Sequence, residues 1–447
     1  MASEGRITRI IKRTGEIVPL DQEKIVNAIY KAAASVGGHD RQLAQRLSDK
    51  VVAMLNRCFP PETTPAVEEI QDIVEKVLIE NGHARTAKAY ILYRDHRARL
   101  RRKKTAGANA QDYIPYRVMW KVLLWNVNHG VDTIEGLNRR VREGSFSQLV
   151  VEADQAFDED VSKAAAAICE SGNQIRMAIV AGPSSSGKTT TMAKLTARLR
   201  ELGRVSVPMS LDNYFFDLEM HPKDEFGDYD FETPEALDLE LINEHLAQLM
   251  AGEMIHVPRY DFKTGTRRQE TDPLSLAENQ LLVVDSLHGL YEPLTRSIPH
   301  QKKFKLYIET ISQLRDERGH FARWADIRLL RRMIRDHRRR SYDPERTIGH
   351  WHYVRRSELK HIIPYIHEAD LILNGALPYE LPILKKYLFH YYPGFIERWR
   401  DDPQRQDTLI RAQRVYELLA AIQEVEDDSC VPGNSLLREF IGGSIYE

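Results

Sequence analysis

Cysteine, net charge and long apolar runs are all scarce in this sequence, and each scarcity excludes a class of protein. Only three cysteines occur among 447 residues and none forms a CxxC pair, which argues against a zinc site and fits a reducing compartment. The formal net charge of −2 provides no basic field for a nucleic acid. No apolar run approaches the roughly 20 residues that span a bilayer, and the first residues lack the apolar core of a signal peptide. We therefore expect a cytoplasmic protein with no nucleic-acid and no membrane partner.

The length indicates more than one domain, because 447 residues exceed what one ordinary core holds. Small polar residues at 105–110 are typical of a linker. We predict a first unit at 1–104, a linker and helical connector at 105–172, and a domain with a C-terminal helical extension at 173–447. An apolar stripe in the connector, from Trp120 to Trp125, is interpreted as core packing and is assigned no chemistry.

The most informative segment is a glycine-rich stretch that begins at Gly182 and continues through Gly187-Lys188-Thr189. An apolar run at 175–181 precedes it and predicts a buried strand, and a helical pattern at 190–202 follows it. Glycines let the backbone wrap a phosphate so that N–H groups and the helix N-terminus point at it. Lys188 would then reach the β/γ-phosphates, and the Thr189 hydroxyl would hold Mg²⁺.

The alternative, a chance glycine-rich turn before a helix, is disfavoured because strand, loop and helix all occur in the required order. The sequence therefore predicts a site for ATP and Mg²⁺. Its predicted nucleotide-binding residues are Gly182, Ser184, Ser185, Ser186, Gly187, Lys188, Thr189 and Thr190.

Strand and helix patterns alternate from about residue 173 onward, which predicts an α/β fold with a parallel sheet covered by helices on both faces. A phosphate loop at the carboxyl end of the first strand fits the general position of ligands in such sheets. The candidate strands are 175–181, 204–210, 281–285, 304–309 and 370–373.

Two carboxylates follow predicted strands and are candidates for chemistry. Asp212 comes just after the second strand, where it could accept a proton from an attacking hydroxyl or join the Mg²⁺ shell. An Asx-turn aspartate is the alternative for this residue taken alone. Asp285 ends the apolar run 280–285, a position from which a carboxylate supports Mg²⁺ through water.

Further along the chain, two segments combine carboxylates with aromatic rings, and a third is rich in arginine. Segments 227–238 and 257–267 suit a flat, polyhydroxylated substrate. In the third segment, four arginines spaced three and four apart would share one helix face and stabilise a transferring phosphate: Arg328, Arg331, Arg332 and Arg335. A solvated basic face and a nucleic-acid-binding helix are alternatives, and the position downstream of the phosphate loop favours a lid.

Taken in this order, the motifs resemble the uridine kinase and phosphoribulokinase family of P-loop kinases over about 173–390. The resemblance implies transfer of the γ-phosphoryl of ATP to a primary hydroxyl, with Asp212 as the base. It also implies that Glu232 binds ribose hydroxyls and Tyr260 lies against the nucleobase. Lys188 and the lid arginines would carry the charge of the phosphates: Arg332, Arg335 and Arg340. We add Tyr214 and Arg267 to the predicted acceptor site.

Three departures from the family pattern bear on this resemblance. Glu232 precedes Thr-Pro where the family usually has aspartate before His-Pro, Gly265 stands where a histidine contacts the pyrimidine, and Tyr342 stands where arginine is common. The first two concern the acceptor. Uridine or cytidine is therefore the first prediction, a sugar, sugar phosphate or polyol is the alternative, and a non-catalytic nucleotide sensor is a second alternative. The segment 435–446 resembles a longer bacterial branch of nucleoside kinases.

The first unit resembles an ATP-cone, the nucleotide-sensing domain of ribonucleotide reductases. The likeness rests on Lys12-Arg13-Thr14-Gly15, on the segment 20–25 and on the segment 90–97. It implies a mainly helical domain that binds ATP or dATP as an effector through Lys12, Arg13 and Lys24, because several cations form charge-assisted hydrogen bonds with a polyphosphate. Regulation through a homo-oligomer is expected. A small helical docking domain with ordinary surface lysines is the alternative.

Overall fold

The structure is a computed structural model that describes residues 7–11, 17–59, 63–91, 115–222, 232–262, 264–340, 342–402 and 405–446. Lys12 and Arg13, two of the predicted effector-binding residues, lie outside the described residues, as does the side chain of Arg340. No helix within these ranges has both the length and the apolar character needed to span a bilayer.

A five-stranded sheet forms the centre of the larger domain, and every pair of neighbouring strands in it is parallel. Its order is β11-β10-β3-β9-β4, and its strands lie within three residues of their predicted bounds at either end. The α/β prediction is therefore confirmed. The strands are β3 (Met177–Ala181), β4 (Ser206–Ser210), β9 (Leu281–Ser286), β10 (Lys303–Glu309) and β11 (Leu371–Asn374).

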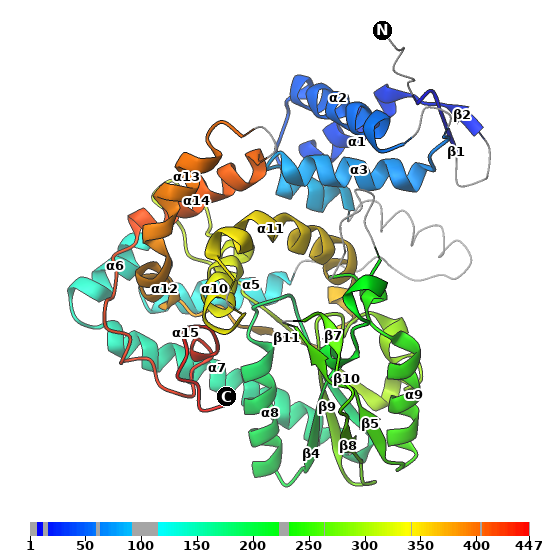
Figure 1. Ribbon diagram of the computed structural model, residues 1–447. Coiled ribbons are helices and arrows are strands. Elements are labelled where there is room, and N and C mark those ends of the chain that lie inside the picture. Colours follow the sequence, from blue (N-terminus) through cyan, green and yellow to red (C-terminus); the bar gives the residue numbers. More distant parts are fainter. Residues whose placement is uncertain are drawn as a thin grey trace.

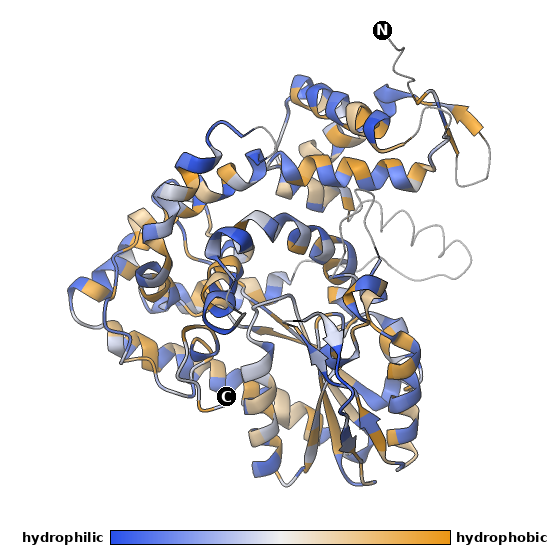
Figure 2. Ribbon diagram, viewed as in Figure 1, coloured by the Kyte–Doolittle hydropathy of each residue, from blue (hydrophilic) through white to orange (hydrophobic). Residues whose placement is uncertain are grey.

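Each face of this sheet is covered by helices because successive side chains of a strand point to opposite faces. On β3, Ala178 and Val180 join one hydrophobic core, whereas Met177, Ile179 and Ala181 join another. Helix α8 (Lys188–Glu201) covers the first face and α9 (Leu239–Met250) the second, as Figure 1 shows. Figure 2 shows largely apolar strands between helices of mixed polarity, the pattern expected of a buried parallel sheet.

Between α9 and β9, two short antiparallel ladders interrupt the alternation of helices with strands of the parallel sheet. One pairs β5 (Ile255–Val257) with β8 (Asp272–Leu274), and the other pairs β6 (Tyr260–Asp261) with β7 (Thr266–Arg267). They support the segment that carries the predicted acceptor residue Tyr260.

The connector consists of α5 (Tyr116–Asn128), α6 (Ile134–Arg142) and α7 (Phe146–Glu170), and it shares a core with the sheet. Helix α7 packs along α8, and α5 packs against β11. The interpretation of 120–125 as core is wrong for Trp120 and Leu124, which are 67% and 49% exposed. The reason is that α5 is apolar on two faces, and only the one carrying Trp125 meets the core.

The N-terminal unit is mainly helical, as predicted. It contains the hairpin β1 (Arg9–Ile11) and β2 (Ile17–Pro19), then α1 (Gln22–Ala34), α2 (Arg41–Cys58), α3 (Val67–Glu80) and helical residues 84–91. Its helix α3 contacts α11 (Pro344–Ser357) and α14 (Gln406–Ala421) of the larger domain. The N-terminal unit therefore lies against the helices that come after the sheet (Figure 1).

The remaining helices surround the carboxyl end of the sheet. They are α10 (Trp324–Arg340), α11 (Pro344–Ser357), α12 (Glu380–Leu388), α13 (Tyr392–Trp399), α14 (Gln406–Ala421) and α15 (Arg438–Ile441). Helix α15 packs against α10, so the C-terminal segment returns to the loop between β3 and α8.

Candidate active site

The loop between β3 and α8 adopts a conformation that only its glycines permit at two positions. Gly187 has φ 100°, in the left-handed region that favours glycine. A Cβ atom on Gly182 would lie 2.3 Å from the carbonyl oxygen of Ile308, so the loop could not pass β10 with a larger residue. Ser185 also has a positive φ of 62°. Such strain is typical of a functional turn.

The polar groups of this loop fit a phosphate ligand. The hydroxyls of Ser185 and Ser186 are buried and make no hydrogen bond within the described ranges, although buried hydroxyls are normally paired. Lys188 folds back over the loop, with its Nζ atom 3.4 Å from the carbonyl oxygen of Pro183. Thr189 is exposed at the first turn of α8. The loop thus offers donors and a cation where the helix dipole favours an anion.

Two carboxylates lie beside this loop because of the sheet register. Asp285 on β9 is paired with Val180 on β3 and with Ser210 on β4. The 3₁₀ turn Leu211–Tyr214, which carries Asp212, begins directly after β4. The structure therefore brings Asp212 and Asp285 to the phosphate loop from neighbouring strands.

The charge of Asp285 is poorly compensated. Burial raises its pKa to about 7, the negative charges of Asp212 and Glu439 add to this rise, and Lys188 partly opposes it. Its Oδ1 atom has no hydrogen-bond partner in the described part of the chain. A divalent cation would satisfy this oxygen and lower that pKa. No three acidic, histidine or cysteine side chains of the described residues form a metal cluster, so Mg²⁺ would need phosphate oxygens as further ligands.

The arginines of α10 divide into two pairs with different contacts. The sequence had predicted one shared role for all four, the stabilisation of a transferring phosphate. Arg328 and Arg331 are buried and bind backbone carbonyls of the loop region. Arg328 donates to the oxygen of Ser184 at 3.2 Å, and Arg331 donates to that of Gly375 at 2.6 Å and to that of Ser186 at 3.4 Å. These two arginines therefore fix the peptide planes of the phosphate loop instead of facing open space.

Buried carboxylates balance this first pair, and sequence reasoning missed them. Arg328 pairs with Glu309 at 2.8 Å and with Glu358 at 2.8 Å, and Arg331 pairs with Glu380 at 2.6 Å. Burial alone would raise the pKa of Glu358, but the positive charges of Arg328 and Arg355 outweigh it and hold that pKa below its usual value. The sequence signal for these partners is weak: each is an acidic residue at the end of a strand or at the start of a helical segment.

In the second pair, Arg332 reaches the phosphate loop, and Arg335 shares a carboxylate with it. Arg332 donates to the Ser184 hydroxyl at 3.1 Å and to the Glu232 carboxylate at 2.9 Å. Arg332 and Arg335 both donate to the buried Asp336, each at 3.1 Å. The structure thus joins a predicted phosphate-binding residue directly to a predicted acceptor-binding residue.

Tyr214 and Arg267 make contacts within the chain that differ from their predicted role. Tyr214 is fully buried, and its hydroxyl lies 2.8 Å from Nδ1 of His245. Arg267 donates to the carbonyl oxygens of Phe215 and Tyr214, each at 2.7 Å. Both residues hold the turn that carries Asp212, so the geometry favours a positioning role over direct contact with an acceptor.

Tyr260 belongs to an aromatic cluster with Phe215 and Phe262. Its ring centroid lies 5.5 Å from that of Phe215 and 5.0 Å from that of Phe262. Such a cluster can pack against a planar group. Gly265, at the nearby turn between β6 and β7, has φ 72°, and a Cβ atom there would lie 3.2 Å from Leu218 Cβ. The turn therefore favours glycine on steric grounds.

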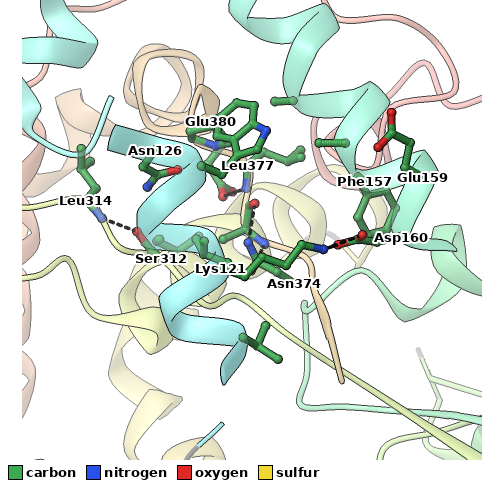
Figure 3. Close-up of a pocket in the computed structure, with 18 of the residues that line it drawn as sticks. Lys121, Asn126, Phe157, Glu159, Asp160, Ser312, Leu314, Asn374, Leu377 and Glu380 are labelled. Atoms are coloured by element: carbon green, nitrogen blue, oxygen red, sulfur yellow. Dashed lines mark hydrogen bonds and ion pairs between the residues drawn. The ribbon is translucent and has the colours of Figure 1, made fainter. Parts of the chain in front are cut away.

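A separate cavity of about 170 Å³ lies between α5, α7 and the segments after β10 and β11 (Figure 3). Its walls are mainly apolar, and polar side chains around it interact within the chain. Lys121 pairs with Asp160 at 2.6 Å, and Glu380 accepts a hydrogen bond from the Leu377 amide at 2.9 Å. None of the predicted site residues lines this cavity. Through Glu380 and Arg331 it adjoins the back of the phosphate loop.

Comparisons with known proteins match two separate parts of the chain. Residues 8–99 match the ATP cone domain, and residues 177–378 match the phosphoribulokinase / uridine kinase family. A uridine kinase of Chloroflexus aurantiacus is 30% identical over 199 residues, which cover 44% of this chain and 85% of that protein. Uridine-cytidine kinase B of Dictyostelium discoideum is 28% identical over 199 residues, 44% of this chain and 74% of that protein. The vitamin B12-dependent ribonucleoside-diphosphate reductase of Thermoplasma acidophilum is 45% identical over 103 residues, 22% of this chain and 13% of that protein.

Proposed function

The chain belongs to the phosphoribulokinase / uridine kinase family of phosphotransferases and carries an ATP-cone, and on that premise we propose that it phosphorylates the 5′-hydroxyl of uridine or cytidine with ATP. The observation that carries the proposal is the convergence of Lys188, Asp212 and Asp285 at one loop. A phosphate-binding loop beside two carboxylates provides both an ATP site and a candidate base.

On the ATP side, the loop 182–190 would bind the phosphates with its amides and with Lys188. Thr189 and Asp285 would hold Mg²⁺, which supplies charge neutralisation on the phosphate oxygens when it is bound. The unpartnered Oδ1 atom of Asp285 and the unpaired loop hydroxyls support this assignment, all judged within the described residues.

On the acceptor side, Asp212 would accept the proton of the attacking hydroxyl. General-base catalysis of this kind contributes about 10²–10⁴-fold in rate. The turn that carries Asp212 is held by Arg267 through two backbone carbonyls, so the carboxylate is positioned before the acceptor arrives. Such preorganisation is what phosphoryl transfer mainly requires.

The lid arginines would stabilise the transferring phosphoryl group. Arg332 connects Ser184 of the phosphate loop to Glu232, and this supports a guanidinium between the two proposed substrates. Arg335 and Arg340 would join it on the same helix. Binding of the acceptor's hydroxyls would draw Glu232 away from Arg332 and leave the guanidinium for the phosphate.

Two observations bear on the choice of acceptor. The aromatic cluster around Tyr260 favours a planar nucleobase. The tight turn at Gly265 leaves no histidine side chain for the edge of a pyrimidine, and this favours the second candidate, a kinase for a sugar, sugar phosphate or polyol.

The deciding experiment is phosphate transfer from ATP-Mg²⁺ across nucleosides, pentoses, sugar phosphates and polyols, with Asp212→Asn as the control. Product from uridine or cytidine that disappears in the variant is the expected result. Turnover only with a sugar or polyol would replace the acceptor and keep the mechanism. ATP binding without turnover of any acceptor would contradict the kinase proposal and favour a nucleotide sensor.

We also propose that ATP or dATP binds the ATP-cone as an effector. Lys24 is well exposed on α1, where it pairs with Asp21 at 3.3 Å and can reach a ligand. The contacts of α3 with α11 support transmission to the larger domain, since α11 follows the lid helix directly. Lys24→Ala should remove one of two nucleotide sites in titration calorimetry and abolish any dATP effect on rate. Sedimentation with and without dATP tests the proposed homo-oligomer, and the mass of a monomer under both conditions would contradict it.

A further inference from the structure

The C-terminal segment Ser435–Ile441 contacts the phosphate loop at the point where a nucleotide phosphate would bind. Glu439 Oε2 accepts a hydrogen bond from the backbone N–H of Thr190 at 2.9 Å, and both residues are buried. The two residues are 249 positions apart in the sequence. Figure 1 shows α15 close to one end of α8.

The N–H group of Thr190 belongs to the set that a phosphate uses. Helix α8 begins at Lys188, and the first N–H groups of a helix have no partner inside the helix. In a phosphate loop these groups bind the phosphates of a nucleotide. Thr191 already bonds to the Gly187 carbonyl, so Thr190 is the last residue whose N–H is available to an external acceptor. Glu439 takes that position with an anionic oxygen, as a phosphate would.

Several contacts hold the segment in this place. Leu436 packs on Gly187, where an added Cβ atom would lie 2.5 Å from Leu436 Cδ1. The ring of Phe440 lies 5.0 Å from the guanidinium of Arg331. Arg339 approaches the carbonyl oxygen of Glu439 at 3.3 Å. The segment therefore touches the phosphate loop and the lid helix α10 at the same time.

A second anchor ties the segment to the connector. The hydroxyl of Ser435 lies 2.8 Å from that of Tyr379 and 3.1 Å from the carboxylate of Asp154 on α7. Ser435 and Tyr379 are fully buried and Asp154 nearly so. Because these anchors are independent of Glu439, the glutamate side chain can leave Thr190 while the rest of the segment stays in place.

Electrostatics decides what happens when ATP arrives. Three carboxylates already lie near one another, those of Glu439, Asp212 and Asp285. Like charges repel each other, and this repulsion is stronger in a buried site than in water. A triphosphate would add further negative charge at the amide that Glu439 occupies, so both cannot remain there.

We propose that Ser435–Ile441 is an internal competitor of the nucleotide: the Glu439 carboxylate occupies the Thr190 N–H and is displaced when a phosphate of ATP binds. Since the backbone carbonyl oxygen of Glu439 accepts a hydrogen bond from Arg339 of α10, movement of the Glu439 side chain is linked to the lid helix while the rest of the segment stays in place. This inference rests on the ATP site of the proposed function and is independent of which acceptor is used.

The test is titration calorimetry of the full chain with ATP in EDTA. The ATP-cone can contribute a second site, so the loop site is defined as the component that Lys188→Ala removes. Glu439→Gln keeps an oxygen for the Thr190 N–H and removes the charge. It should tighten the loop-site Kd by about fivefold, because a hydrogen bond to a charged group is worth about 1 kcal/mol more than one to a neutral group.

The matched control is Glu426→Gln, an exposed glutamate of the same C-terminal region, which should leave Kd unchanged. Glu439→Ala should tighten binding at least as much as Glu439→Gln, and thermal melts establish that each variant is folded. A Glu439→Gln Kd equal to or weaker than that of the unmodified chain would overturn the inference while the ATP site stands. Absence of any Lys188-dependent component in every variant would contradict the ATP site and the inference with it.

Discussion

Helix α10 presents arginines of one chemistry to two different environments. Arg328 and Arg331 are buried among Glu309, Glu358 and Glu380, and they bind the backbone of the phosphate loop. Arg332 and Arg335 are 19% and 17% exposed and share Asp336 at the edge of the site. The first pair holds the backbone of the loop, whereas Arg332 of the second pair contacts a hydroxyl of the loop. A run of arginines after a phosphate loop therefore does not by itself indicate phosphate ligands.

The largest effect on stability should come from the first pair, Arg328 and Arg331. Arg331→Ala leaves the fully buried Glu380 without its cation, and such a loss typically costs about 3–5 kcal/mol in the free energy of unfolding. Urea denaturation measures it. The matched variant Arg332→Ala should cost clearly less, because its side chain is 19% exposed and the buried Asp336 keeps its hydrogen bond from Arg335. Equal losses for the two variants would erase the distinction between the pairs.

When activity is measured instead of stability, the larger effect should come from the second pair, Arg332 and Arg335. We expect Arg332→Ala to lower kcat by about 10²–10³-fold with a smaller loss of stability than Arg331→Ala, since it removes a preorganised donor aimed at developing charge. Arg332→Lys should recover only part of the rate because lysine cannot contact Ser184 and Glu232 with one planar group. A kcat within twofold of the unmodified enzyme would show that Arg332 is structural, like Arg331.

Two buried carboxylates, Glu358 and Asp285, also differ in how well nearby positive charge compensates them. Arginines hold the pKa of Glu358 down, whereas burial raises that of Asp285 to about 7. The unfolded-state pKa of aspartate is about 4, so the stability contributed by protonated Asp285 is fully present below about pH 4 and is lost as the pH rises through 7.

Asp285→Asn removes this titration. Without nucleotide or Mg²⁺, it should raise the free energy of unfolding at pH 8 by about 1–3 kcal/mol and have little effect at pH 4. Denaturation curves at both pH values measure the difference, with the exposed Asp401→Asn as the control. A gain of equal size at both pH values would mean that Asp285 is not the titrating group.

The smallest effect should lie farthest from α10, at the aromatic cluster. Tyr260→Ala should raise KM for a nucleoside acceptor about tenfold, since stacking of a base on an aromatic ring is worth about 1–3 kcal/mol. KM for ATP should stay the same. Tyr116→Ala, at an exposed tyrosine on α5, is the control. If KM for the acceptor does not change either, the base does not contact this cluster.

The parts predicted well from the sequence are those whose signal is local. The phosphate loop needs glycines at fixed positions, and a buried strand needs an uninterrupted apolar run, so Gly182, Gly187 and the five strands could be located within a few residues. The mainly helical first unit is likewise encoded in local periodicity.

The parts missed depend on partners that are distant in sequence. Arg328 meets Glu358 30 positions later, Arg331 meets Glu380 49 positions later, and Thr190 meets Glu439 after 249. No periodicity within one segment encodes such pairs. The exposed Trp120 shows the converse case, in which a local apolar pattern does not determine which of two helix faces meets the core.

The distance between Thr190 and Glu439 also has a consequence for synthesis. The phosphate loop leaves the ribosome 249 residues before the segment that packs on it. At about 5–20 residues per second, this delay is roughly 12–50 s. During that interval a nascent chain has Gly187 and the first turn of α8 without Leu436 and Glu439. Cellular ATP could therefore occupy the loop of the growing chain first, and the last-made segment would have to fold around a ligand already in place.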